Sequence, residues 1–359
     1  MKKQSYRLLD LFCGCGGISE GYALAGYQIA GGIDFNEDAT KTFQHNFRDA
    51  AVFCTDISQF DNSRVKEEYH DIDVIVGGPP CQGFSSANRW QKEADDPRNK
   101  LFFQFLRFVE VLKPKAVMIE NVRGLLTRDN GYAKERIESL LDEMGYNVSM
   151  AVLCASDYGV PQDRHRAIIV GIKRYNPKDQ RRFDFASIPL SDKTTVIDAI
   201  GELYAFENKR PETMRLKKAP DTPLRAYYRR EDGLVPDHVS VYPAEKVQER
   251  IKHVPQGGNW QDVPDDLWSN LRSNRHSSAY RRLKEDEPSC TIDTGNAHSN
   301  YFHPIYNRIP SIRESARLQS FPDSFEFIGT RGSKYKQVGN AVPPLLAKAI
   351  AEQLKEYIK

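Results

Sequence analysis

The feature that most constrains the fold is the alternation of short apolar runs with helical stretches over residues 1–172. Six apolar runs are predicted to be buried parallel strands: Arg7–Phe12, Gln28–Ile33, Asp73–Val76, Ala116–Ile119, Val148–Leu153 and Ala167–Ile172. The helical stretches between them include Asn99–Leu112, preceded by Pro97, and Lys134–Met144, followed by Gly145 as a stop signal. This alternation predicts an α/β fold with a doubly wound, mostly parallel sheet that binds ligands at the carboxyl ends of its strands.

The composition changes after this region. From Ile172 to Arg230 the chain has 14 Lys and Arg against 8 Asp and Glu, although the whole chain has 51 against 49 and a net charge of +2. Residues 220–305 are rich in Pro, Gly, Asn, Ser, Arg and Tyr and show no long helical period, which is typical of irregular, loop-rich structure.

Helical patterns return at Ser311 and end in an amphipathic tail that carries Leu346, Ile350 and Leu354. The economical interpretation is one α/β domain that is interrupted and then completed by the end of the chain. The predicted parts are the α/β domain over residues 1–184, an inserted irregular domain over residues 185–305 and a completing segment over residues 306–359.

Several function classes lack support in the sequence. The mean hydropathy is −0.60 and no run of about 18 apolar residues occurs, so no membrane span is expected. The first twelve residues become polar too soon for a signal peptide, so we expect a cytosolic or nuclear type of chain. The six cysteines form no CxxC pair and the eight histidines no HExxH motif, so neither a disulfide nor a metal site is expected. Cys13 and Cys15 are interpreted as turn residues.

Residues at three successive strand ends favour a nucleoside cofactor. The first strand runs into the glycine-rich stretch Asp10–Gly17, where the backbone can approach a ligand closely, as it does for NAD, FAD or S-adenosylmethionine. Asp34 follows the second strand and suits ribose hydroxyls, the neighbouring Phe35 can stack on adenine, and Asp56 can accept a hydrogen bond from an adenine amino group. Each acid alone is more commonly a helix cap or a solvated loop residue, but together they favour a cofactor.

Two further strand ends carry groups suited to covalent chemistry. The strand predicted over Asp73–Val76 leads into Gly77–Ser85, where two prolines and flanking glycines present Cys81 on an open, rigid loop. Glu120 directly follows a buried run, and its apolar neighbours favour a proton donor at neutral pH. A thiolate beside a general acid is a recognisable division of labour in catalysis.

Together these motifs resemble, in order and over nearly the whole chain, the DNA (cytosine-5)-methyltransferases of bacterial restriction-modification systems. The motifs that carry the resemblance are DLFCGCGG (residues 10–17), GGPPCQGFS (77–85), ENV (120–122), PQDRHR (161–166), RESARLQ (313–319) and QVGNAVP (337–343).

The resemblance implies a Rossmann-like, S-adenosylmethionine-dependent fold with an inserted target-recognition domain, and no metal. It implies methyl transfer to carbon 5 of a flipped cytosine through a covalent Cys81 adduct, with Glu120 hydrogen-bonding to ring nitrogen N3 or protonating it. It places Arg164 and Arg166 beside the base and, of the two, favours Arg164. Asn121 is expected to fix the local backbone and the base, and His165 to be structural.

The resemblance also carries over cofactor-binding positions for S-adenosylmethionine and its product S-adenosylhomocysteine. These positions are Phe12, Gly14, Gly16, Gly17, Asp34, Phe35, Asp56, Ile57, Gly78, Leu101, Asn340 and Val342. Two depart from the usual family pattern, which often has Glu where Asp34 stands and Trp where Phe35 stands. Both replacements keep the physical role with a shorter reach or a smaller stacking area.

Double-stranded DNA is the partner that the resemblance implies. Its readers are expected in residues 185–305, with Arg272–His276, Arg281 and Arg282 as candidates for phosphate or base contacts. We expect a cytoplasmic, nucleoid-associated monomer whose cognate restriction endonuclease, if one exists, is a separate chain without a stable complex. The recognition sequence does not follow from the residues.

Three alternatives fit the sequence less well. A nicotinamide dehydrogenase shares the glycine loop and the acid but has no use for the PPC, ENV and QxRxR motifs together. A tRNA methyltransferase of the same family is closer, but its usual Cys-Phe-Thr signature is absent here. A non-catalytic DNA-binding regulator would be expected to lack the cysteine or the acid, and both Cys81 and Glu120 are present.

Overall fold

The computed structural model of the chain describes residues 5–80, 100–127, 131–207, 214–268, 280–293 and 301–359. The chain divides into two compact units. The first comprises Met1–Tyr158, His165–Leu190 and Val342–Lys359, and the second comprises Gly159–Arg164 and Ser191–Ala341. The second unit therefore continues past residue 305, where the sequence placed the end of the inserted domain. The assignment of target recognition to residues 185–305 stays a prediction.

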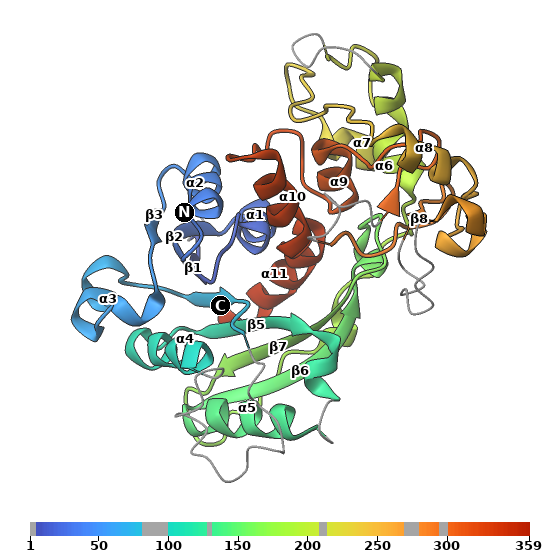
Figure 1. The fold of residues 1–359 in the computed structure, drawn as a ribbon. Coiled ribbons are helices and arrows are strands. Elements are labelled where there is room, and N and C mark those ends of the chain that lie inside the picture. Colours follow the sequence, from blue (N-terminus) through green and yellow to red (C-terminus); the bar gives the residue numbers. More distant parts are fainter. Residues whose placement is uncertain (1–4, 81–99, 128–130, 208–213, 269–279, 294–300) are drawn as a thin grey trace. The chain divides into compact units, whose positions relative to one another are not determined.

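The first unit is built on a seven-stranded mixed sheet with flanking helices, which confirms the α/β fold (Figure 1). Its strands are β1 (Arg7–Leu11), β2 (Gln28–Asp34), β3 (Ala51–Cys54), β4 (Val74–Gly77), β5 (Ala116–Val122), β6 (Tyr146–Cys154) and β7 (His165–Lys173). Their order in the sheet is β3-β2-β1-β4-β5-β7-β6. The chain winds outward from β1 in one direction and from β4 in the other, as a doubly wound sheet requires.

The direction of β7 corrects the expectation that all six predicted strands run in parallel. β1, β2, β3, β4 and β5 pair in parallel, but β7 runs antiparallel to both β5 and β6. β6 ends at Cys154 and β7 begins at His165, and no α-helix lies between them. A parallel pairing of adjacent strands needs a crossover of about a dozen residues or more, usually helical, so this short connection favours antiparallel pairing.

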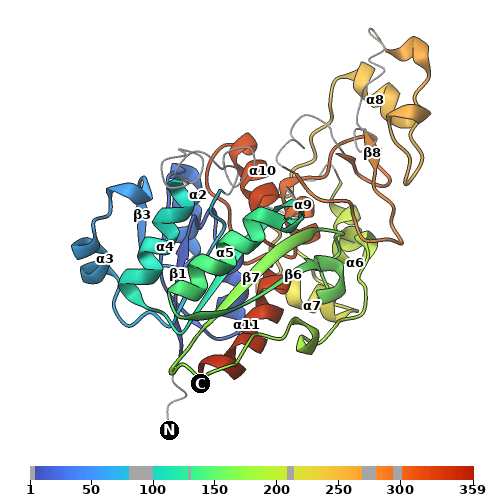
Figure 2. The ribbon, with the colours of Figure 1, turned by 90° about the horizontal axis from the view of Figure 1, so that it is seen from below.

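Among the described residues of the first unit, six α-helices flank the sheet. They are α1 (Gly17–Leu24), α2 (Glu37–Asn46), α3 (Asn62–Glu68), α4 (Lys100–Leu112), α5 (Tyr132–Glu143) and α11 (Pro344–Ile358). α4 and α5 lie against the sheet (Figure 2). Side chains of α3, α4 and α5, such as Val65, Phe105 and Leu141, join those of the strands in one apolar cluster. Gly145 adopts a φ of 87° and its N–H bonds the carbonyl of Asp142, so it ends α5 as the sequence predicted.

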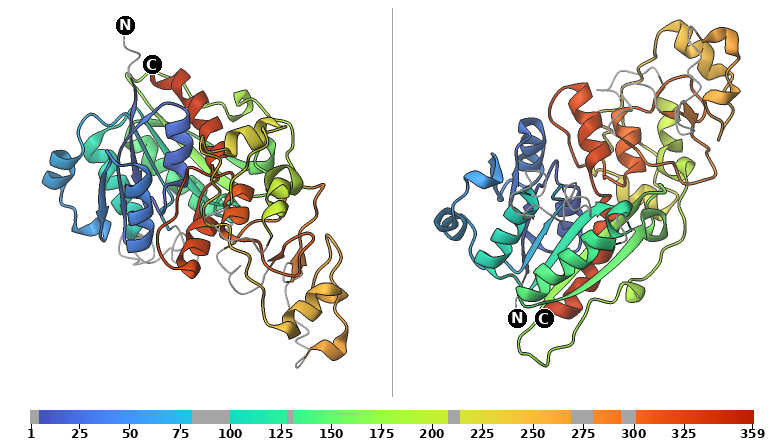
Figure 3. Two further views of the ribbon diagram at one scale, coloured as in Figure 1. Left: turned by 90° about the horizontal axis from the view of Figure 1, so that it is seen from above. Right: turned by 60° about the horizontal axis from the view of Figure 1, so that its bottom comes forward.

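The C-terminal helix belongs to the first unit and packs on α1 (Figure 3). The hydroxyl of Tyr27 donates to the carbonyl of Ala351 at 3.0 Å. Gly21 lies at the crossing, where an added Cβ would stand 2.5 Å from Cβ of Ala347 and 2.7 Å from the nitrogen of Lys348. The two helices approach this closely because position 21 has no side chain.

The second unit is loop-rich, as the composition predicted. Its helices are α6 (Val196–Ile200), α7 (Pro223–Tyr228), α8 (Glu245–Lys252), α9 (Ile312–Leu318) and α10 (Arg331–Asn340), joined by short 3₁₀ turns. Within the residues that the structure describes, this unit has one two-stranded sheet, β8 (Arg281–Arg282) with β9 (Tyr301–Phe302). Few of its backbone groups are therefore bonded in ladders. None of the helices among the described residues has the length and apolar character that a membrane span needs.

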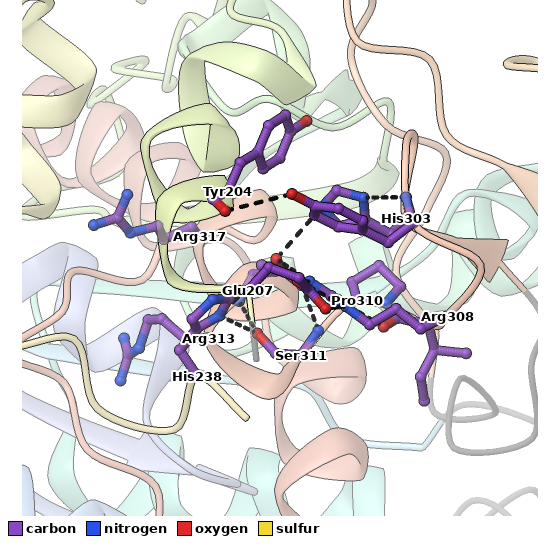
Figure 4. Close-up of polar contacts among 12 residues, drawn as sticks. Tyr204, Glu207, His238, His303, Arg308, Pro310, Ser311, Arg313 and Arg317 are labelled. Atoms are coloured by element: carbon purple, nitrogen blue, oxygen red, sulfur yellow. Dashed lines mark hydrogen bonds and ion pairs between the residues drawn. The ribbon is translucent and has the colours of Figure 1, made fainter. Parts of the chain in front are cut away.

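A buried charge network surrounds the start of α9 (Figure 4). Ser311 and Glu314 form a capping box at this helix end, and the Glu314 carboxylate also pairs with Arg308 at 2.7 Å. His238 donates to or accepts from the Ser311 hydroxyl at 2.8 Å. Burial would raise the pKa of Glu314, but His303 and Arg308 hold that pKa well below its usual range. The RESARLQ motif thus supplies charged residues to the interior of the second unit.

We predict that Gly21→Ala destabilises the first unit by about 1–3 kcal/mol, because the added methyl group overpacks the contact between α1 and α11. Gly332→Ala is the matched control, since this helical glycine has no heavy atom within 4 Å of an added Cβ. Alanine should be neutral or stabilising there. Thermal unfolding followed by circular dichroism checks both variants, and equal melting temperatures would contradict the packing argument.

Candidate active site

The carboxyl ends of β1 to β5 meet at one edge of the sheet, because these five strands run in parallel. β7 runs the opposite way, so it begins at this edge. Among the described residues, the predicted site residues of the first unit lie at these strand ends, as Asp34, Glu120 and Arg166 do, or in the loops and helix starts next to them. Val342 is the exception and lies two residues before α11. The edge is thus the candidate active site of the first unit.

The glycine-rich stretch after β1 forms a tight loop that leads into α1. Phe12 and Gly14 have positive φ angles of 60° and 51°, and Gly16 caps the helix with a φ of 98°. An added Cβ at Gly14 would meet nothing within 4 Å, so the backbone is open to a ligand at this point. Gly17 is the buried first residue of α1. The loop therefore presents backbone to the edge of the sheet, as a cofactor loop requires.

Asp34 fixes this loop from the end of β2. One carboxylate oxygen accepts the N–H of Gly14 at 2.9 Å, and the other accepts the N–H of Asn36 at 2.9 Å. Burial raises the pKa of Asp34, while these backbone N–H groups oppose the rise. Phe35 beside it is 77% exposed, which is unusual for a large aromatic side chain. An exposed ring next to a carboxylate is suited to stacking on a base whose ribose the carboxylate binds.

The third acid lies two residues beyond β3. Asp56 is exposed and accepts the N–H of Ser58 at 2.8 Å, and this backbone hydrogen bond lowers its pKa. The next residue, Ile57, is buried in the core. Leu101 is in the first turn of α4 and is partly buried against the same core. Val342 is buried immediately before α11.

A carboxylate and a guanidinium meet where β5 and β7 pair. Nε of Arg166 lies 2.8 Å from Oε1 of Glu120, and both side chains are largely buried. Glu120 is opposite Ile168 in the register, so Arg166 is its diagonal neighbour across the pair. An added Cβ at Gly78 would stand 3.1 Å from Oε2 of Glu120, so glycine leaves room for the carboxylate.

Asn121 connects this pair to the loop after β4. Its side-chain amide donates to the carbonyl of Pro79 at 3.0 Å, and its oxygen accepts the N–H of Val122 at 3.0 Å. Pro79 precedes Cys81 by two residues, although Cys81 itself lies outside the described residues. The ENV motif therefore holds the beginning of the loop that carries the predicted nucleophile.

Two predicted site residues belong to the second unit. β7 begins at His165, so Arg164 lies just before the strand that carries Arg166 and belongs to the second unit. The Arg164 side chain is 2% exposed and donates to the carbonyls of Ile292 and Gly339 at 3.0 and 2.9 Å. Residues 160–164 are drawn into the second unit by a parallel bridge between Gln162 and Ser289. Asn340, at the end of α10, is exposed.

A buried carboxyl that the sequence did not single out lies under the glycine loop. Asp10 is 1% exposed, and its Oδ2 accepts the hydroxyl of Ser19 at 2.7 Å. Burial raises the pKa of Asp10 to about 7 against the effect of this hydrogen bond. Its Oδ1 is buried without a hydrogen-bond partner. The sequence signal was an acid inside an apolar strand, a position where a charged group is costly and needs a reason.

The cysteines of the loop are not activated. Cys13 and Cys15 are buried, and burial raises the pKa of both thiols. A thiol with a raised pKa is a poor nucleophile and a poor metal ligand. In the part of the chain that the structure describes, no three His, Cys, Asp or Glu side chains are grouped to hold a metal ion. These two residues are turn residues in the structure.

Residues 6–356 match the family model of the C-5 cytosine-specific DNA methylases. The chain belongs to this family. It is 35% identical over 372 residues to the Type II methyltransferase M.DdeI of Desulfomicrobium norvegicum, covering 98% of this chain and 89% of that protein. It is 36% identical over 354 residues to M1.HphI of Haemophilus parahaemolyticus, covering 97% and 86%. The protein is therefore a DNA (cytosine-5)-methyltransferase of the restriction-modification type.

Solved structures agree on the fold of this methyltransferase. A DNA modification methyltransferase encoded within an E. coli prophage superimposes with a TM-score of 0.76 at 25% identity, covering 98% of this chain and 99% of that one. The Dnmt2 methyltransferase of S. pombe superimposes with a TM-score of 0.62 at 20% identity, covering 98% and 99%. The second likeness concerns the fold alone.

The candidate DNA-reading arginines of the methyltransferase differ in their surroundings. Arg272–His276 lie outside the described residues. Arg282 is buried, and its guanidinium donates to the carbonyls of Val254, Ile251 and His303 at 2.6, 2.7 and 3.1 Å, so it does not face DNA. This corrects its candidacy as a DNA contact, since a guanidinium saturated by carbonyls has no donors left for phosphate.

Arg281, by contrast, is exposed and lines a cavity of about 450 Å³ in the second unit, together with Asp163, Cys290 and Tyr301. Burial raises the pKa of Cys290 to about 11, which favours the protonated thiol at neutral pH.

We predict that Asp10→Asn makes the stability of the enzyme less dependent on pH. The folded-state pKa of about 7 lies above the ordinary value of 3.8, so the folded carboxyl binds more protons than the unfolded one, and wild-type stability falls as the pH rises from about 4 to 7. The free energy of unfolding of Asp10→Asn, relative to that of the wild type, should therefore increase by on the order of 2 kcal/mol between pH 5 and pH 8.5.

Urea unfolding at the two pH values measures this change. Ser19→Ala is the matched control, because it keeps the buried carboxyl and removes a hydrogen bond that lowers its pKa. That variant should keep the pH dependence. Equal pH slopes in the wild type and in Asp10→Asn would show that the carboxyl does not titrate in this range.

Proposed function

We propose that this enzyme transfers a methyl group from S-adenosylmethionine to carbon 5 of cytosine in one short duplex DNA sequence, by base flipping and a covalent Cys81 adduct. The observation that carries the proposal is the Glu120–Arg166 pair at the same sheet edge as the cofactor loop. Asn121 ties this pair to the loop that leads to Cys81. The biological role would be protection of host DNA within a restriction-modification system.

The residues of the first unit fit the proposed cofactor. Phe35 is exposed for stacking on adenine, and the open backbone at Gly14 lies beside the carboxylate of Asp34. Phe12, Gly16, Gly17, Asp56, Ile57, Gly78, Leu101 and Val342 would complete the cofactor-binding residues of the first unit. Asn340 is the further cofactor contact that the family resemblance implies. When bound, S-adenosylmethionine supplies an electrophilic methyl group on a positively charged sulfur.

Carbon 5 of cytosine is a poor nucleophile until carbon 6 is attacked. The Cys81 thiolate would form a bond from sulfur to carbon 6, and Glu120 would bond or protonate ring nitrogen N3, where negative charge develops. Carbon 5 would then accept the methyl group, whose bond to the cofactor sulfur breaks, and S-adenosylhomocysteine would be left. Loss of the carbon 5 proton to a base and cleavage of the sulfur–carbon 6 bond would release methylated cytosine and restore Cys81.

Arg166 would orient the acid in this scheme. Its Nε bonds one carboxylate oxygen of Glu120 at 2.8 Å and leaves the other beside Gly78, where the glycine keeps space free. A fixed carboxyl is preorganised for N3 and needs no rearrangement during the reaction. The pair is therefore suited to holding the Glu120 carboxyl in a fixed direction for contact with N3.

The target base must leave the duplex before Cys81 can reach carbon 6, at a cost of a few kcal/mol for unstacking and unpairing. We propose that target recognition lies in residues 185–305 and that Arg281 is a candidate for a phosphate contact. The enzyme would act on double-stranded DNA as a cytoplasmic, nucleoid-associated monomer. Any cognate endonuclease would be a separate chain without a stable complex.

Bisulfite sequencing of a host that lacks its own cytosine methylases and expresses this chain tests the proposal. We expect conversion-resistant cytosines within one short recurring sequence. Cys81→Ser should abolish them while DNA binding persists, whereas Cys54→Ser, at an exposed cysteine, should leave them unchanged. Fully converted DNA despite bound S-adenosylmethionine would refute methylation of DNA, and tRNA would be the next substrate to examine.

We predict that Glu120→Gln slows methyl transfer by about 10²- to 10⁴-fold, because the amide cannot protonate N3. Single-turnover transfer of a radiolabelled methyl group to a duplex oligonucleotide measures the rate. Glu143→Gln, at an exposed position of α5, is the matched control with the same chemical change and should react at the normal rate. A normal rate for Glu120→Gln would remove the acid from the mechanism.

A further inference from the structure

Three fully buried side chains form a hydrogen-bonded hub in the second unit. Gln162, Arg164 and Gln319 are 0%, 2% and 0% exposed. The Gln162 amide donates to the side-chain oxygen of Gln319 and to the carbonyl of Leu318, the latter at 3.1 Å. These bonds join the QDRHR motif to the end of α9. The Glu120–Arg166 pair described above does not include them.

The hub holds the C-terminal end of α10. The Gln319 amide donates to the carbonyls of Val338 and Ala341, both at 2.9 Å. Arg164 donates to the carbonyl of Gly339 at 2.9 Å. The last carbonyls of a helix have no partners within the helix, so side chains must satisfy them when they are buried.

The residue between these anchored carbonyls is Asn340. α10 ends at Asn340, whose side chain is exposed, while the carbonyls at positions 338, 339 and 341 are all bonded by the hub. The preceding residue is Gly339, whose backbone is intrinsically permissive. These hydrogen bonds therefore fix the backbone on both sides of Asn340, and without them the orientation of Asn340 would be poorly determined.

The other end of the hub is equally anchored. The oxygen of the Gln162 amide accepts the N–H of Ile292 at 3.1 Å, and Arg164 donates to the carbonyl of the same residue at 3.0 Å. In the parallel bridge between Gln162 and Ser289, the Ser289 carbonyl accepts the N–H of Asp163 at 2.9 Å and the Ser289 N–H donates to the carbonyl of Pro161 at 3.0 Å. The hub is thus also hydrogen-bonded to the segment that contains Ser289 and Ile292, which restricts its movement together with the end of α10.

We propose that Gln319 and Arg164 are positioning residues for cofactor binding, which fix Asn340 by holding the carbonyls on both sides of it. This inference rests on the proposed function, in which Asn340 contacts S-adenosylmethionine. It gives Arg164 a place in the reaction that differs from contact with the flipped base. Both residues act through Asn340 and would not touch the cofactor themselves.

The test compares two variants that lose the same kind of hydrogen bonds. Gln319→Met removes an amide that donates to two carbonyls. Asn147→Leu is the matched control, because the buried Asn147 amide donates to the carbonyls of Asp179 and Arg181, both at 2.9 Å, in the first unit. Isothermal titration calorimetry with S-adenosylmethionine measures the dissociation constant of each full-length variant.

We expect Gln319→Met to raise the dissociation constant for S-adenosylmethionine about tenfold. The reason is that the variant loses both hydrogen bonds that hold the carbonyls of Val338 and Ala341. Asn147→Leu should stay within about twofold of the wild type. Arg164→Lys, which keeps the charge but loses the planar fork, should also raise the constant and serves if Gln319→Met fails to fold. Equal changes in Gln319→Met and Asn147→Leu would overturn the proposal.

A double-mutant cycle with Asn340→Ala separates positioning from general destabilisation. Asn340→Ala alone should weaken S-adenosylmethionine binding, and adding Gln319→Met should then cause little further loss, because the two residues act through one contact. Additive losses would overturn the positioning role. Failure of the wild type to bind S-adenosylmethionine would overturn the proposed function itself, whereas normal binding by Asn340→Ala would overturn only this inference.

Discussion

Parallel pairing of β1 to β5 is the constraint on which the candidate active site depends. Parallel strands run in one direction, so every strand of this set ends at the same edge and every following loop starts there. Residues that are far apart in the sequence, such as Asp34 and Glu120, therefore lie at one edge of the sheet because their strands run in the same direction. The reversed strand β7 begins at that edge, so it places the guanidinium of Arg166 against the carboxylate of Glu120.

In the second unit, side chains rather than backbone ladders bond many buried carbonyls. Its described residues have a single two-stranded sheet, so many buried carbonyls cannot find partners in a backbone ladder. Long polar side chains supply the missing donors: Arg282 bonds the carbonyl of Val254, Arg313 bonds those of Pro236, Pro322 and Phe325, and Gln319 bonds the end of α10. A guanidinium has five donors in a planar fork, which suits it to this purpose.

This use of arginine explains why charge alone is an incomplete guide to the DNA-binding surface. Arg308 and Arg317 are fully buried in pairs with Glu314 and Asp323. Breaking such a pair by removing one partner costs about 3–5 kcal/mol, because the other charge stays buried without compensation. The positive charge of the second unit therefore includes buried cations that hold its interior together, such as Arg308 and Arg317, and only its exposed cations are available to phosphate.

The sequence predicted the parts of the fold that depend on local pattern. The apolar runs predicted β1, β2, β4 and β5 to within a few residues, and Gly145 ended α5 as expected. The direction of β7 was wrong, because strand direction depends on which neighbour a strand finds and an apolar run is the same in either direction. Helix α10 was not predicted, since Arg331–Asn340 has no marked apolar face and is held by its ends. The site residues carried over from the family stay predictions.

The short stretch Pro161–Arg166 shows why a motif cannot be translated into roles residue by residue. In an extended chain alternate side chains point to opposite sides. Gln162 and Arg164 are buried, while Asp163 and His165 are exposed. Up to Arg164 the buried side bonds carbonyls within the second unit, and at Arg166 the chain has entered β7, where the neighbour is a carboxylate at the sheet edge. Two arginines two residues apart thus have different partners, because the backbone between them passes from one unit to the other.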